Sequence, residues 1–202
     1  IAMDAVIEAD RVCEGTICYT GDILNPDRAK YDLKYYVSMA KELESAGAHV
    51  LGLKDMAGLL KPAAAKALIG ALKQEIGLPI HFHTHDPSGI SGATVLAAAE
   101  AGVDAVDAAM DAFAGGTSQP ALGSIVEALA HTERDTGLDI AEIRKISSYW
   151  EQVRAQYTGG VSLRSFVTGD DIADTVLFLA SPAAAKITGQ AMTIDGHTES
   201  MV

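Results

Sequence analysis

Cysteine, basic residues and long apolar runs are all scarce in this sequence of 202 residues. Two cysteines, Cys13 and Cys18, are too few for a disulfide framework or a four-ligand zinc ribbon, so we expect reduced thiols in a cytoplasmic protein. No apolar run approaches the roughly 18 residues of a membrane span. Acidic residues outnumber basic ones by 27 to 15, and the net charge of −12 would repel the phosphates of nucleic acid. The sequence therefore predicts a soluble metabolic protein with no nucleic-acid or membrane partner.

Short apolar runs alternate with amphipathic stretches at a regular interval over the first 110 residues. Three helices are expected between the runs: Asp27–Ala46, Pro62–Ile76 and Ile90–Ala101. Buried strands are expected at the runs themselves: Thr16–Tyr19, His49–Lys54, Pro79–His83 and Ala105–Met110. The strands begin roughly 30 residues apart, which is the length of one βα unit. Such an alternation predicts a parallel sheet covered on both faces, and four units are half of an eightfold barrel.

Two further helices are expected after the fourth strand, over Ser118–Ala130 and Ile140–Tyr157. Thr158-Gly159-Gly160 follows, and consecutive glycines are typical of a break between elements. We therefore place a boundary here, with residues 1–157 as the half-barrel and residues 158–202 as a second segment.

The second segment has the pattern of one αβ unit. Asp170–Ala180 is expected to be an amphipathic helix with Gly169 or Asp170 as its N-cap, and Gln190–Ile194 a last short strand. Because one helix and one strand cannot enclose a core, we expect this segment to pack on the preceding sheet.

Three histidines stand at alternate positions near the end of the third predicted strand: His81, His83 and His85. Alternation along a strand sends them to one face, at the end of the sheet where barrel active sites are built. Several inward-facing imidazoles are hard to satisfy without a ligand. A metal site is therefore favoured over the alternative, in which one or two of them are hydrogen-bonded core residues.

Lys54 lies at the end of the second predicted strand. An isolated lysine there would be expected to extend its ammonium group to solvent at the rim. Burial inside a barrel is costly for a cation unless the lysine is modified or paired. Because the histidines lie only one strand away, we favour a site that Lys54 shares with them.

Segments in order resemble the carboxyltransferase domain of the pyruvate carboxylases: Cys18–Asp22, Lys54–Pro62, His83–Asp86, and Thr117–Pro120 followed by Gly123–Leu129. The resemblance covers residues 1 to about 157 and corresponds to the second half of that barrel. Related decarboxylases and transcarboxylases share the lysine and the histidines, but less clearly Ser118-Gln119-Pro120.

The resemblance implies a role for each candidate residue. Lys54 corresponds to the carbamylated lysine that bridges to the metal, His83 and His85 correspond to the two histidine ligands, and His81 is not a ligand. The family uses zinc or manganese, which favours formation of the pyruvate enolate that carboxybiotin carboxylates. Its aspartate ligand and its pyruvate-binding arginine and glutamine belong to the first half of the barrel, and its proton-shuttling threonine to a later region. These segments are not in the sequence, and neither is a biotin attachment site.

Four segments of the tail resemble the last helix and strand of the short-chain dehydrogenases: Val161–Val167, Asp170–Ala173, Leu177–Pro182 and Thr188–His197. The sequence has neither the glycine-rich turn that cradles a dinucleotide nor a Tyr-x-x-x-Lys motif. We therefore expect no NAD site and no oxidoreductase activity, and a structural role for the tail.

These resemblances lead to an engineered chimera as the main hypothesis. On this view an α/β scaffold combines four βα units of a TIM-type half-barrel with one added αβ unit. We expect this scaffold to be catalytically inactive and to keep at most residual binding of zinc or manganese. The chain begins at Ile1 without an initiating methionine, which we interpret as a fragment or a trimmed chain.

The alternative is an enzyme. Two half-barrels would pair into a dimer with metal-dependent carboxyltransferase or oxaloacetate decarboxylase activity, although a second copy brings only the same half. Exposed sheet edges favour a homo-oligomer under either hypothesis. The sequence does not decide between an open sheet, Rossmann-like or flavodoxin-like, and a sheet closed across a two-fold axis.

Overall fold

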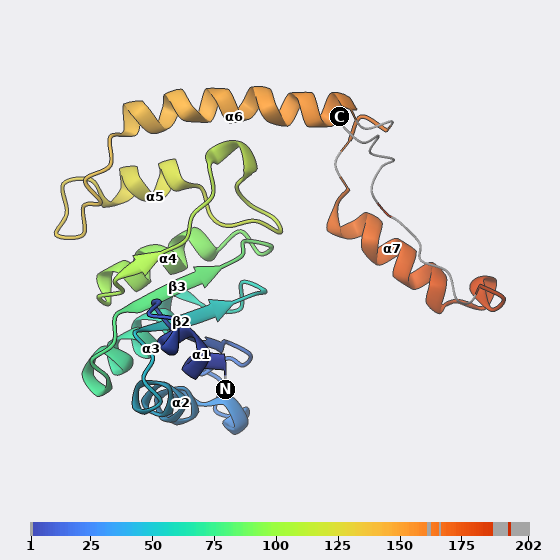
Figure 1. The fold of residues 1–202 in the computed structure, drawn as a ribbon. Coiled ribbons are helices and arrows are strands. Elements are labelled where there is room, and N and C mark those ends of the chain that lie inside the picture. The colour runs from blue at the N-terminus through green and yellow to red at the C-terminus, as the bar shows by residue number, and fades with distance from the viewer. Residues whose placement is uncertain (1, 161–162, 166, 188–193, 195–202) are drawn as a thin grey trace. The chain divides into compact units, whose positions relative to one another are not determined.

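The computed structural model describes residues 2–160, 163–165, 167–187 and 194 (Figure 1). Two compact units divide the chain, Ile1–Lys145 and Ile146–Val202. No helix among the described residues has both the length and the apolar character that crossing a membrane requires.

The first unit is an α/β fold built on one parallel sheet. Its strands are β1 (Glu14–Cys18), β2 (Val50–Asp55), β3 (Ile80–Thr84) and β4 (Ala105–Val106), paired in the order β1-β2-β3-β4. This confirms the predicted α/β class and the four βα units. A doubly wound sheet reverses its strand order at a switch point. The described strands show no reversal, and their sequential order is that of a barrel segment.

One helix of the first unit precedes β1, and the other four follow the four strands in turn. They are α1 (Ala2–Glu8), α2 (Leu33–Ser45), α3 (Pro62–Glu75), α4 (Ser91–Glu100) and α5 (Leu122–Leu129), with 3₁₀ turns at Ala29–Tyr31 and Asp111–Phe113. No helix was expected at the position of α1.

Two predicted boundaries were wrong. The first long helix begins at Leu33 instead of Asp27, because the Asp32 carboxylate accepts a hydrogen bond from the backbone N–H of Tyr35 at 2.8 Å and caps it there. The fourth strand has two residues rather than six. After Val106 the chain turns toward the segment before α5, where Ala109 and Pro120 are joined by a backbone hydrogen bond of 2.9 Å.

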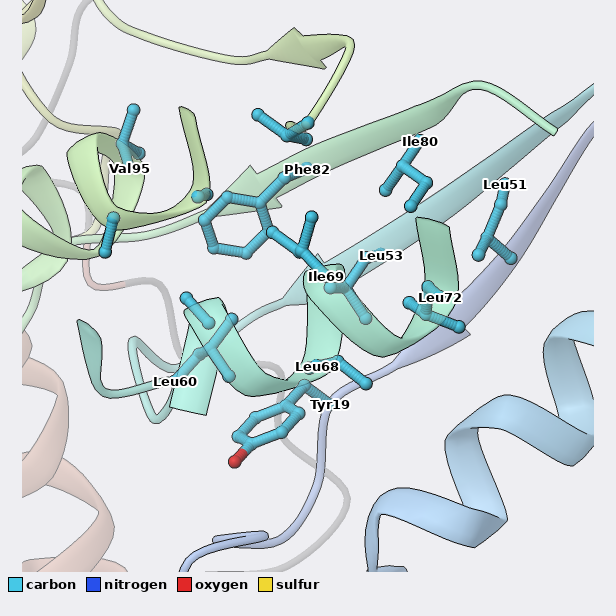
Figure 2. Close-up of a cluster of buried hydrophobic side chains, with 14 of the residues drawn as sticks. Tyr19, Leu51, Leu53, Leu60, Leu68, Ile69, Leu72, Ile80, Phe82 and Val95 are labelled. Carbon is cyan, nitrogen blue, oxygen red and sulfur yellow. The ribbon is translucent and has the colours of Figure 1, made fainter. Parts of the chain in front are cut away.

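The hydrophobic core lies between the sheet and the helices α2, α3 and α4. Leu53 and Phe82 point from the sheet toward α3, whose Leu68 and Leu72 are fully buried (Figure 2). Strand β3 alternates buried and half-buried residues, so only alternate side chains enter this core. The expectation of a sheet covered on both faces is therefore wrong for the first unit, and its second face is the one that carries the polar residues.

Helix α6 (Ile140–Gly160) crosses the division between the two units, and α7 (Gly169–Ala180) lies in the second. The N-cap of α7 is Thr168, in a reciprocal capping box with Asp171, so the prediction of Gly169 or Asp170 was wrong. A 3₁₀ turn follows at Pro182–Ala184. Of the predicted strand Gln190–Ile194, residues 190–193 lie outside the described residues.

Candidate metal site

The polar face of the sheet carries the candidate residues at neighbouring positions. Lys54 of β2 is in register with His83 of β3, so their side chains leave the sheet on the same face. His85 follows the end of β3. A cavity of about 180 Å³ lies at this face and is lined by Glu14, Thr16, Gly52, Leu53, Lys54, His81, His83 and Asp107. The structure thus brings Lys54 and His83 together, as the sequence predicted.

The two expected histidine ligands face each other. The Nε2 atoms of His83 and His85 are 3.0 Å apart. Each ring contacts an acceptor through Nδ1: His83 the Asp107 carboxylate at 2.6 Å, and His85 the backbone carbonyl of Thr117 at 2.6 Å. A carbonyl oxygen and an ionised carboxylate can only accept, so both Nδ1 atoms donate.

This arrangement leaves two lone pairs directed at each other. A neutral imidazole that carries its proton on Nδ1 presents a bare Nε2, and two bare nitrogens 3.0 Å apart repel. Either a shared proton or a metal ion removes that repulsion. Two nitrogen ligands of a tetrahedral zinc ion are separated by about 3.3 Å. The donor set of His83 and His85 therefore fits a divalent metal after a shift of a few tenths of an ångström.

The half-buried side chain of Lys54 forms no hydrogen bond or ion pair within the described part of the chain, whereas its backbone carbonyl accepts from the N–H of Tyr19 at 2.8 Å. No group of three or more His, Cys, Asp or Glu side chains in that part is arranged to hold a metal ion. The histidine pair would accordingly need a ligand of another type, and Lys54 is next to His83 in register.

His81 has a different environment from the other two histidines. Its Nδ1 lies 3.1 Å from Glu14 Oε2, and its Nε2 lies 3.0 Å from Asp107 Oδ1. Burial alone would lower the pKa of His81, but the hydrogen bonds to Asp107 and Glu14 outweigh burial and raise it. Both nitrogens of the His81 imidazole are therefore engaged by carboxylates.

Sequence reasoning missed Asp107 and Glu14. Burial opposes the ionisation of Asp107, but hydrogen bonds from His83 and His81 lower the pKa of this carboxyl below its usual range. The available signal was the position of Asp107 within the apolar run of the fourth predicted strand. A carboxylate in such a run needs partners, and its partners turn out to be the two histidines.

The loop after β2 holds the backbone near His85. Buried Asp55 accepts hydrogen bonds from the N–H groups of Leu59 and Leu60 at 2.8 and 2.9 Å. Ser91 Oγ donates to the His85 carbonyl at 2.7 Å. The Thr84 hydroxyl donates to the Asp55 carboxylate at 3.1 Å, and the His85 N–H donates to the Asp55 carbonyl at 3.2 Å. Because these bonds join the end of β3 to the end of β2 and its loop, the backbone of His85 is held in place.

Two family models match the chain. The HMGL-like model matches residues 20–149, and the model described as Enoyl-(Acyl carrier protein) reductase matches residues 138–197. The two matches overlap at residues 138–149, around the start of α6.

Pyruvate carboxylases are similar to the chain at the level of sequence and of structure. Those of Bacillus subtilis and Caenorhabditis elegans are 51% and 52% identical over 158 residues, which is 78% of this chain and 14% and 13% of theirs. The carboxyl transferase domain of Rhizobium etli pyruvate carboxylase, also solved with pyruvate and biocytin, is 70% identical with a TM-score of 0.75, over 76% of this chain and 26% of that one. The chain thus spans about a seventh of the length of the Bacillus subtilis and Caenorhabditis elegans relatives.

Proposed function

The chain belongs to the HMGL-like family, and from that membership we propose that it binds a divalent metal ion as one half of a carboxyltransferase site. Lys54, His83 and His85 are the proposed ligands, and zinc or manganese the proposed metal. The observation that carries this proposal is the pair of imidazole Nε2 atoms facing each other at 3.0 Å.

Each proposed ligand has a separate task. His83 and His85 each keep a proton on Nδ1 and present the Nε2 lone pair. The ammonium form of Lys54 has no lone pair, so Lys54 must lose a proton or be carbamylated before it can bind a cation. When bound in such a site, the metal acts as a Lewis acid that stabilises negative charge developing on a carbonyl oxygen.

We propose that these 202 residues alone bind metal without transferring a carboxyl group. The aspartate ligand and the pyruvate-holding residues expected from the resemblance are not among them. A dimer would contribute Lys54, His83 and His85 a second time and nothing new. Oxaloacetate decarboxylation measured on the metal-loaded protein, with its mass from light scattering, separates the two cases: turnover by a dimer would favour the paired half-barrel.

We also propose that the chain is an engineered chimera with a structural tail. This is supported by family models of unlike description that match consecutive parts of the sequence. Helix α6 contains all but the first two residues of that overlap, and also the predicted junction at Thr158-Gly159-Gly160. The proposed role of the second segment is to contribute to folding rather than to bind a dinucleotide.

Metal titration tests the proposed function. Calorimetric titration with zinc should show one site per chain, and the double variant His83→Ala/His85→Ala should lose it. His131→Asn is the matched control, because His131 is exposed, lies outside the cluster and has a φ of 62°, which asparagine tolerates. Unchanged zinc affinity in the double variant would contradict the proposal.

A further inference from the structure

A chain of side chains extends from the proposed ligands across the sheet. Asp107 bridges two histidines, with Oδ2 2.6 Å from His83 Nδ1 and Oδ1 3.0 Å from His81 Nε2. His81 in turn contacts the Glu14 carboxylate through Nδ1, at 3.1 and 3.2 Å from its two oxygens. The network therefore connects Asp107, which follows β4, through His81 of β3 to Glu14 of β1, and it passes over β2.

Asp107 controls which nitrogen of His83 is available. A neutral imidazole carries its proton on either Nδ1 or Nε2, and only the Nδ1–H form leaves Nε2 free to bind a metal. An ionised carboxylate at 2.6 Å accepts from Nδ1–H and so stabilises that form. His85 reaches the same form through the backbone carbonyl of Thr117. A side chain thus does for His83 what the backbone does for His85.

His81 and Glu14 hold Asp107 in turn. Glu14 of β1 can reach His81 of β3 only by crossing β2, and the residue of β2 in the same register row as His81 is Gly52. A Cβ atom on Gly52 would lie 2.4 Å from Glu14 Oε1 and 2.6 Å from Thr16 Oγ1. The missing side chain at Gly52 is therefore what gives the Glu14 carboxylate room to lie over the sheet.

We propose that Asp107, held by His81 and Glu14, is a positioning residue that fixes the Nδ1–H form of His83 and so directs Nε2 toward a divalent metal. The proposal rests on the proposed metal-binding function. It adds that the geometry of the site depends on a network spanning β1 to β4 and on the space left at Gly52.

The first test measures the tautomer of His83 without metal. In the ¹⁵N–¹H spectrum of imidazole-labelled protein, wild-type His83 should show one Nδ1–H tautomer, and Asp107→Ala should show a mixture of both. Asp104→Ala is the matched control, because Asp104 contacts Lys73 and the N–H of Ile80 instead of the histidines. A single Nδ1–H tautomer retained in Asp107→Ala would overturn the proposal.

The second test measures cobalt binding by its visible absorption spectrum. Loss of an outer hydrogen-bond partner of a ligating histidine typically weakens metal affinity by about 10- to 100-fold, and we expect a loss in that range for Asp107→Ala, with an altered spectrum. Gly52→Ala, which displaces Glu14, should weaken binding in the same direction but less. Wild-type affinity in both variants would overturn the proposal. If the wild type binds no cobalt, the proposed function fails, and the metal-free tautomer still decides the role of Asp107.

Discussion

Gly58 offers a sharp test of how closely the loop after β2 packs on the end of β3. Its φ is +63°, and a Cβ atom there would lie 2.8 Å from the backbone oxygen of His85 and 3.2 Å from Ser91 Oγ. Gly89 has a similar φ of +72°, but a Cβ atom there would meet nothing within 4 Å. The two glycines therefore share the backbone conformation and differ in the space around it.

This difference sets the magnitude expected for each alanine variant. The left-handed conformation costs a non-glycine residue about 1–2 kcal/mol. Replacing glycine by alanine also lowers the conformational entropy of the unfolded chain, which offsets about 0.4–1 kcal/mol of that cost. Gly89→Ala should therefore lower the free energy of unfolding by about 1 kcal/mol. Gly58→Ala adds an overlap with a backbone atom that cannot rotate away, which costs a further 1–3 kcal/mol or so.

Urea unfolding followed by circular dichroism measures the two losses under the same conditions. We expect Gly58→Ala to be the less stable variant by at least about 1 kcal/mol. Its zinc affinity should fall as well, because the displaced atom is the carbonyl of a proposed ligand, His85. If Gly58→Ala and Gly89→Ala lose the same free energy of unfolding, the loop after β2 can move away from the His85 carbonyl without cost. That result would refute the close packing of this loop on the end of β3.

Two further predictions concern stability alone. Gly70 lies inside α3, where a Cβ atom would meet nothing within 4 Å, so Gly70→Ala should raise the free energy of unfolding by about 0.5–1 kcal/mol, and a loss in urea unfolding would contradict this. Burial of Asp104 opposes its ionisation, but hydrogen bonds from Lys73 and the Ile80 N–H lower the pKa of this carboxyl below its usual range. A folded-state pKa below the unfolded one stabilises the protein above about pH 4, and this stabilisation is lost as pH falls through the folded-state pKa. The difference in free energy of unfolding between wild type and Asp104→Asn should thus become smaller as the pH falls from 6 to 3. A difference that stays constant would contradict a stabilising role for the ionised Asp104 carboxylate.

The fold was predictable where local pattern dictates it. Apolar runs near β2 and β3, and the proline that opens α3, located those elements within a few residues. The start of α2 was predicted six residues too early, because the Asp32 cap that begins the helix lies inside the predicted range Asp27–Ala46. The length of β4 was missed because the backbone after Val106 pairs with residues near Pro120, a contact that periodicity does not report.

The placement of the candidate residues was predictable from the sequence, but the side chains that contact them were not. Alternation and strand succession brought Lys54 and His83 together from sequence alone. Asp107 and Glu14 were missed because their role depends on the register of four strands and on the space over Gly52. Strand register and the space over Gly52 both arise only when separate segments of the chain come together in the sheet.

The proposed metal lies between His83 and His85. An anomalous difference map from crystals of the zinc-loaded protein, collected at the zinc absorption edge, would locate it. We expect one peak about 2.0–2.1 Å from both Nε2 atoms, with the Lys54 side chain reaching the same ion. A peak elsewhere, with the two imidazoles still facing each other across a shared proton, would contradict this expectation.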